Sequence, residues 1–152
     1  MVKAACDGDL AELQRLRAAG HAWAVYVCQC AAAGGHLELL QWARTHGCPW
    51  DEWTCAGAAA GGHLELLQWA RANGCPWNEW ACYYATLNGH LELLQWARAH
   101  GCPWNRYMIL ANTNPTSAVH AWVESCGGDF DTSGARTKSA AARQTPYTAT
   151  AV

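Results

Sequence analysis

Apolar residues recur along the chain with the spacing of an amphipathic helix. In residues 63–72 (HLELLQWARA), an apolar stripe is formed by Leu64, Leu67, Trp69 and Ala70, whereas the Glu, Gln and Arg residues lie largely off it. Glu65 falls in the first turn and Arg71 in the last, which is the arrangement that the helix dipole favours. Gly74 and Pro76 then stop the helix. The pattern predicts a helix over 63–72.

A shorter helix is predicted before each of these. Residues 51–61 (DEWTCAGAAAG) and 78–88 (NEWACYYATLN) begin with Asp51 and Asn78, which are suitable N-cap residues. Gly57 inside the first of them costs about 1 kcal/mol relative to Ala. We expect these small-residue helices to depend on close packing against their neighbours.

The whole pattern repeats every 27 residues. The stretch GHLELLQWAR, two variable residues and then a Gly-Cys-Pro-Trp turn starts at Gly35, at Gly62 and at Gly89. Residues 8–23 fit the same frame without a gap, and residues 115–127 fit it with one residue deleted. The predicted units, in chain order, are 1–23 (partial), 24–50, 51–77, 78–104 and 105–127 (degenerate).

A unit of two helices cannot bury both of its apolar stripes alone. Stacked units can, because each covers the face that its neighbour exposes. The ten Trp residues then fall into columns that stabilise the stack. The columns are Trp42, Trp69 and Trp96; Trp23, Trp50, Trp77 and Trp104; and Trp53 and Trp80. The predicted fold class is an all-α solenoid of stacked helix-turn-helix units.

The motif GHLELLQWARANG at 62–74 resembles the second helix of an ankyrin repeat, and WTCAGAAAG at 53–61 aligns with that family's first helix. Cys55 falls on the family's first-helix Leu, and the Ala pair at 58–59 falls on its small-residue pair. The usual unit of about 33 residues is shortened by about six. The missing segment normally forms a projecting β-hairpin, and Gly-Cys-Pro-Trp takes its place. The resemblance, over about 1–127, implies an ankyrin-like array that binds another protein.

Charge and hydropathy exclude several other classes of partner. Charged residues make up 14% of the chain and the net charge is −2, so nothing attracts nucleic acid. No apolar run is long enough to cross a membrane, and the opening residues lack the apolar core of a signal peptide. We therefore expect no nucleic-acid or membrane partner. The predicted location is intracellular, in the cytoplasm with the nucleus as the alternative, where the nine cysteines stay reduced.

The Cys and His residues raise the question of metal or redox chemistry. They recur in three columns: Cys28, Cys55 and Cys82; Cys48, Cys75 and Cys102; and His36, His63 and His90. Equivalent residues of stacked units lie about 8–10 Å apart, too far to share a zinc ion or form a disulfide. The nearest pair in sequence between columns is a C-x6-C, outside the usual zinc spacing. We interpret Cys as a small buried apolar residue and predict no cofactor. A Cys/His metal-binding or redox-sensing protein stays as an alternative.

Catalysis is not predicted. Every candidate thiol or imidazole has a copy in other units, whereas a catalytic residue is normally unique in its chain. There is no phosphate-binding glycine loop and no paired acidic motif. We expect no enzyme activity and no small-molecule substrate.

The first helices vary between units, and this variation points to recognition. Gln29, Ala56 and Tyr83 are equivalent positions. In the family that the chain resembles, first-helix residues line the concave groove. The predicted partner-binding residues are Glu52, Glu79, Tyr83, Tyr84 and Arg106. The alternative is that one Tyr packs against the fifth unit.

The chain changes character after the array. Residues 128–152 are rich in Ser, Thr and Ala without an apolar period, and we predict a disordered tail. Because Met1 falls inside the first helix of the first unit, a fragment of a longer structural repeat array is a further hypothesis.

Overall fold

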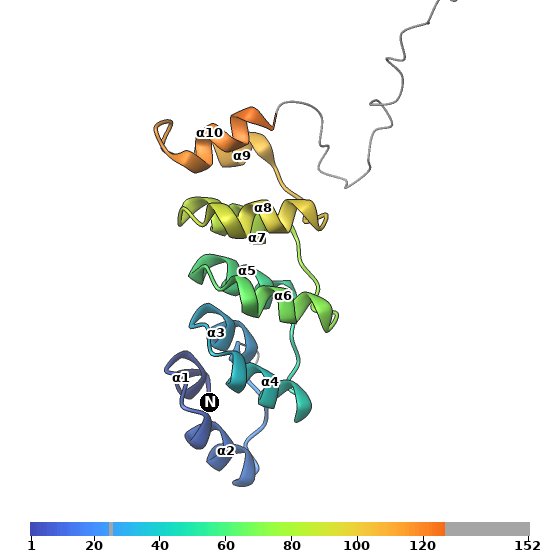
Figure 1. The fold of residues 1–152 in the computed structure, drawn as a ribbon. Helices are drawn as coiled ribbons and strands as arrows, with labels where there is room; N and C mark the ends of the chain where they lie inside the picture. The colour runs from blue at the N-terminus through green and yellow to red at the C-terminus, as the bar shows by residue number, and fades with distance from the viewer. Residues whose placement is uncertain (25, 127–152) are drawn as a thin grey trace, which may run out of the picture.

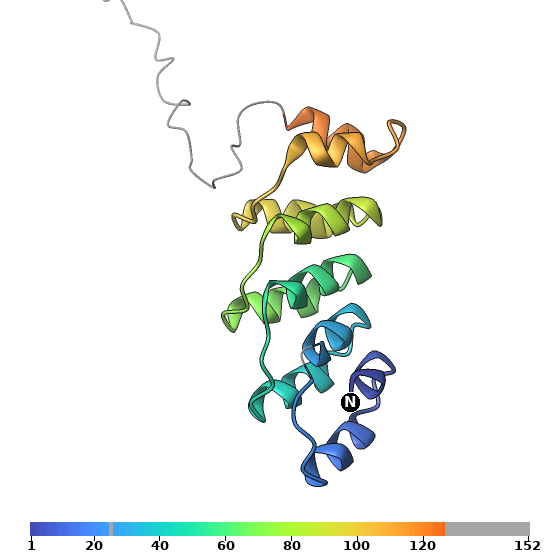
Figure 2. The same ribbon diagram turned by 180° about the vertical axis from the view of Figure 1, so that it is seen from behind.

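The computed structural model describes residues 1–24 and 26–126, and every regular element in that part of the chain is an α-helix. The helices stack in pairs, from α1 and α2 at one end to α9 and α10 at the other (Figure 1), and the same ladder is seen from behind in Figure 2. In chain order they are α1 (Val2–Cys6), α2 (Leu10–Ala18), α3 (Val27–Ala33), α4 (Leu37–Thr45), α5 (Glu52–Gly61), α6 (Leu64–Ala72), α7 (Glu79–Leu87), α8 (Leu91–Ala99), α9 (Arg106–Ala111) and α10 (Ala118–Ser125). The predicted all-α solenoid is confirmed. The predicted tail at 128–152 lies outside the described residues.

Polar caps begin the first helices as predicted. The side chains of Asp51 and Asn78 accept hydrogen bonds from the backbone N–H groups of Trp53 and Trp80, each at 3.1 Å. Each cap thereby satisfies one of the N–H groups that the first turn leaves without a partner. Gly62 joins α5 to α6 with φ of 73°, a left-handed conformation that residues with a Cβ rarely adopt.

The first helices pack against one another along the array, α1 on α3, α3 on α5 and α5 on α7. Small residues permit this close approach. A Cβ built on Gly57 would lie 2.9 Å from the backbone oxygen of Gln29, closer than real Cβ contacts. The packing of α7 on α9 is much sparser than these, so the stack loosens at its last step.

The second helices bury a wider face than the predicted stripe. In α6, Leu66, Leu67 and Ala70 are buried, whereas Leu64 and Trp69 are only half-buried. The predicted stripe omitted Leu66, and this was wrong. A helix inside a stack is covered by its own unit and by both neighbouring units, so its buried face is broader than that of a surface helix.

An Arg–Trp–Trp arrangement links each unit to the next. The guanidinium of Arg44 lies 4.0 Å from the ring centroid of Trp50, and Trp50 meets Trp69 of the following unit edge to face at 5.8 Å. Arg44 also donates a hydrogen bond to the carbonyl of Cys48. The equivalent Trp pairs are Trp23–Trp42, Trp77–Trp96 and Trp104–Trp122. The Trp columns therefore contact one another across units.

The histidines that begin the second helices connect neighbouring units. Nε2 of His63 lies 3.1 Å from the carbonyl oxygen of Ala33, near the end of the first helix of the previous unit. His36 and His90 make the same contact with the carbonyls of Cys6 and Ala60. Each imidazole therefore joins two units.

Candidate functional site

One position of the first helix carries an aromatic residue in four successive units. Tyr26, Trp53, Trp80 and Tyr107 are spaced by 27 residues, and we call them the aromatic column. Tyr26 is 60% exposed, Trp53 36% and Tyr107 84%, while Trp80 is half-buried. Within residues 1–24 and 26–126, the large exposed hydrophobic residues are three members of this column and Leu87. The column is therefore the most exposed aromatic surface of the described array.

Tyr83 and Tyr84 lie beside the column. Trp53 and Trp80 stack with ring centroids 6.1 Å apart, and Trp80 meets Tyr83 edge to face at 5.4 Å. Tyr84 lies 6.0 Å from Trp80 and 5.6 Å from Tyr83. Tyr83 also packs against the buried core. Both tyrosines are half-buried, so the fold brings these two predicted residues into one aromatic cluster with Trp53 and Trp80.

Two carboxylates border this cluster. Glu52 and Glu79 are the first residues of α5 and α7, and each directly precedes a Trp of the aromatic column. The helices α3, α5 and α7 contain no Lys or Arg. The side chains of this surface are therefore aromatic or neutral, with acidic residues at the edge.

Arg106 occupies the position equivalent to these glutamates, at the start of α9. Its Nε and Nη2 atoms donate to the carbonyl oxygens of Val123 and Glu124, at 3.3 and 3.2 Å. The structure thus directs Arg106 onto α10. A role of Arg106 in partner binding stays a prediction.

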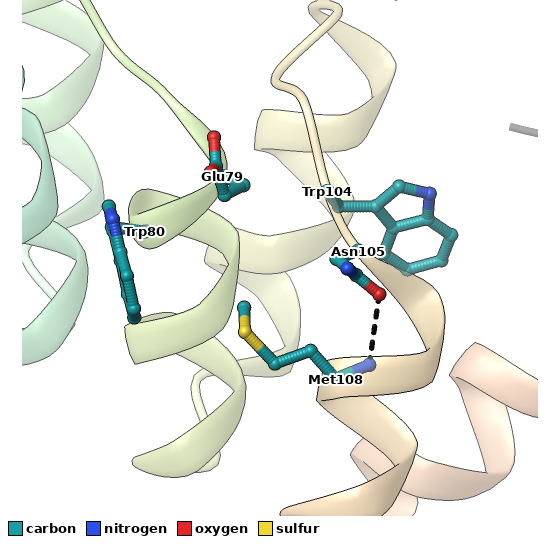
Figure 3. Close-up of a pocket in the computed structure, with 5 residues that line it drawn as sticks. All are labelled: Glu79, Trp80, Trp104, Asn105 and Met108. Carbon is teal, nitrogen blue, oxygen red and sulfur yellow. Dashed lines mark hydrogen bonds between the residues drawn. The ribbon is translucent and has the colours of Figure 1, made fainter. Parts of the chain in front are cut away.

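A cavity of about 100 Å³ opens between α7 and α9 beside the cluster. Its lining residues are Glu79, Trp80, Trp104, Asn105 and Met108. Figure 3 shows Met108 extending from α9 towards α7, with the ring of Trp80 seen edge-on and Glu79 above it. The Asn105 side chain caps α9 by accepting a hydrogen bond from the Met108 N–H at 3.0 Å. The cavity lies where the first-helix packing is sparsest.

Comparison with protein families matches residues 55–98 to ankyrin repeats, a family that occurs in many copies. Residues 55–98 are thus similar to ankyrin repeats. The matched stretch runs from Cys55 in α5 into α8, and so covers the part of the array where the GHLELLQWAR motif is most regular. Ankyrin repeats are in general protein-binding modules. A comparison with curated proteins found no match.

The shape of the repeat units agrees with the shortened unit expected from the sequence. Residues 48–51 and 75–78 run without regular structure, and the described part of the chain contains no β-strand. None of the described helices has both the length and the apolar character needed to cross a membrane.

The cysteines of the array come together in pairs that sequence spacing did not reveal. The Sγ atoms of Cys28 and Cys48, 20 residues apart, lie 3.1 Å from each other and both side chains are buried. Hydrogen bonding to Cys48 and burial raise the pKa of the Cys28 thiol. The contacts of Cys55 with Cys75 and of Cys82 with Cys102 likewise raise the pKa values of Cys75 and Cys102. The hydrogen bond with Cys28 lowers the pKa of the Cys48 thiol. The three thiols with raised pKa values stay protonated, and a protonated, buried thiol is a poor nucleophile and a poor metal ligand.

Metal coordination needs more ligands than these pairs provide. Across residues 1–24 and 26–126, no three His, Cys, Asp or Glu side chains converge in a way that could hold an ion. The paired cysteines instead fill the space between the first helix of a unit and its Gly-Cys-Pro-Trp turn. Their arrangement is that of small apolar core residues.

Sequence reasoning missed most of the aromatic column as a functional surface. It placed Trp53 and Trp80 in a column that stabilises the stack, and it did not connect them with Tyr26 and Tyr107. The signal was present, because all four residues share one 27-residue register. Counting Tyr together with Trp would have identified it.

Proposed function

We propose that these ankyrin repeats bind another protein through the aromatic column together with Tyr83 and Tyr84. The observation that carries the proposal is the exposure of Tyr26, Trp53 and Tyr107 at a single repeated position. Tyr and Trp are the residues that most often dominate binding energy, because they offer large amphipathic area at little cost in side-chain entropy.

The proposed role is recognition without catalysis. A rigid stack holds the aromatic column in place, so little conformational entropy is lost on binding. Glu52 and Glu79 border the surface and select the charge of the partner. We further propose that the protein acts inside the cell, where the free thiols of its paired cysteines persist.

Matched variants of the full chain test the proposal. The surface variant carries Tyr26→Ser, Tyr84→Ser and Tyr107→Ser, and the control variant carries Gln68→Ser and Gln95→Ser on exposed positions of α6 and α8. We expect proteins retained by the wild-type chain to be retained by the control variant and lost with the surface variant. Circular dichroism establishes that both variants keep their helix content. Equal retention by the two variants would remove the aromatic column from the proposed function.

A further inference from the structure

The stack of the aromatic column is interrupted at α9. Between α5 and α7, the ring of Trp53 is covered by Trp80, with the two planes inclined by 24°. Tyr107 occupies the next position, yet it is 84% exposed and makes no ring contact with Trp80 within the described residues. Tyr107 therefore does not continue the stack of Trp53 and Trp80 towards α9.

The cavity lies at this interruption. Glu79 and Trp80 line it from α7, and Asn105 and Met108 line it from the α9 segment (Figure 3). Its volume of about 100 Å³ exceeds what a single water molecule needs. Trp104 forms the remaining wall, and the guanidinium of Arg98 already lies over its ring, 4.4 Å from the centroid. Trp80 is therefore the aromatic surface that the cavity offers to a ligand.

We propose that this cavity binds an arginine side chain of the partner protein, with its guanidinium stacked on Trp80 and hydrogen-bonded to the Glu79 carboxylate. The inference rests on the proposed function and names the chemistry of the partner. An apolar occupant would cover Glu79 without a compensating charge, which is costly, whereas a guanidinium supplies that charge.

Arginine side chains already stack on tryptophan rings elsewhere in the array. Four of its arginines already place a guanidinium between 4.0 and 4.6 Å from a Trp ring centroid. A planar guanidinium stacks on an indole and binds a carboxylate through two parallel hydrogen bonds, which an ammonium group does not do. Arginine is therefore favoured over lysine.

The two helices that flank the cavity, α7 and α9, supply no cation to it. Arg106 is directed onto the carbonyls of α10, and α7 contains neither Lys nor Arg. The sequence contains two further arginines, Arg136 and Arg143, outside the described residues. They are the competing occupants that the experiment must separate from a partner.

The experiment uses a neutral heptapeptide with one central arginine and the same peptide with citrulline, an uncharged analogue of nearly the same shape. Binding to the full chain is followed by nuclear magnetic resonance of the Trp80 indole N–H, which is assigned with Trp80→Phe. We expect the arginine peptide to shift this signal and the citrulline peptide to bind at least about tenfold more weakly. Equal binding of the two peptides would overturn the proposal.

Two variants and a matched control locate the contact. Glu79→Gln should weaken arginine-peptide binding about three- to tenfold, and Met108→Trp should abolish it by filling the cavity. Glu52→Gln, at the equivalent position where Trp80 already covers Trp53, should leave the affinity unchanged within about twofold. If Glu79→Gln and Glu52→Gln behave alike, the assignment to this cavity is wrong.

A last comparison separates the partner from the chain's own residues and from the broader function. If Arg136→Gln with Arg143→Gln tightens peptide binding tenfold or more, the chain occupies its own cavity and a partner arginine is excluded. If Glu79→Gln and Met108→Trp still retain the proteins that the surface variant loses, the aromatic column binds protein but the cavity does not bind a partner arginine.

Discussion

Nε2 of His63 lies 3.1 Å from the backbone carbonyl of Ala33, thirty residues earlier in the chain. The contact crosses from one repeat unit to the next, and the imidazole lies against Gly35, whose Cβ, if present, would meet the His63 ring at 2.5 Å. The Gly-His motif is thus a joint between units, in which Gly provides the space and His provides the hydrogen bond.

Removing the imidazole should weaken the array. His63→Leu leaves the Ala33 carbonyl without its protein partner, and we expect a loss of about 1 kcal/mol in the free energy of unfolding. Urea denaturation measures the change. His21→Leu is the control, because His21 is exposed and its side chain joins no other unit. Equal stability of the two variants would show that the joint contributes nothing.

Gly62 and Gly89 distinguish the cost of placing Ala in a left-handed backbone conformation from the cost of placing its Cβ against the His90 ring. Gly62 and Gly89 have φ of 73° and 76°, so replacing either with Ala should cost about 1–2 kcal/mol. A Cβ on Gly62 would also lie 2.6 Å from the His90 ring, whereas nothing lies within 4 Å of one on Gly89. We expect Gly62→Ala to cost about 1 kcal/mol more than Gly89→Ala in thermal or urea unfolding. The reverse order would contradict the role given to His90.

The buried thiols predict a fall in stability in mildly alkaline solution. The Cys75 pKa is raised in the folded state, first by its hydrogen bond with Cys55 and then by burial, while an unfolded thiol ionises near pH 8.5. The folded chain therefore keeps a proton that the unfolded chain releases, so stability is fully present below about pH 8.5 and falls above it. Each such thiol contributes up to about 1.4 kcal/mol per pH unit.

Urea titrations at about pH 7.5 and pH 9.5 measure this slope. Cys75→Ala should make it shallower, because one of the thiols with a raised pKa is removed, whereas Cys6→Ala, at an exposed position, should not. A wild-type stability that is constant or rises over this range would show that the thiols are not protected.

Thiol labelling should separate the cysteines into classes. Cys6 is exposed and should react with an aromatic disulfide reagent at the rate of a free thiol, while Cys30 and Cys126 are half-buried and should react more slowly. The paired cysteines should react after unfolding in denaturant, because their side chains are buried and the pKa values of several are raised. Rapid reaction of more than three thiols in the native chain would contradict the pairing.

The period of the sequence was sufficient to predict the fold, but not the contacts between columns. The 27-residue register predicted helix pairs and N-caps at Asp51 and Asn78, because these depend on neighbours in sequence. It did not predict that Cys28 meets Cys48, since this depends on how a first helix lies against its turn. Nor did it predict that Trp80 is half-buried whereas Tyr107 is exposed. They occupy one register position, but α9 has six residues and packs sparsely on α7, so Tyr107 is exposed.

Site-specific photocrosslinking tests the central claim most directly. A benzophenone side chain replaces Tyr84 or Tyr107 on the first-helix surface, or Gln68 on the exposed side of α6, in otherwise identical full chains. If the aromatic column binds the partner, the same protein is crosslinked from positions 84 and 107 and not from position 68. Crosslinks from position 68 alone would contradict the account.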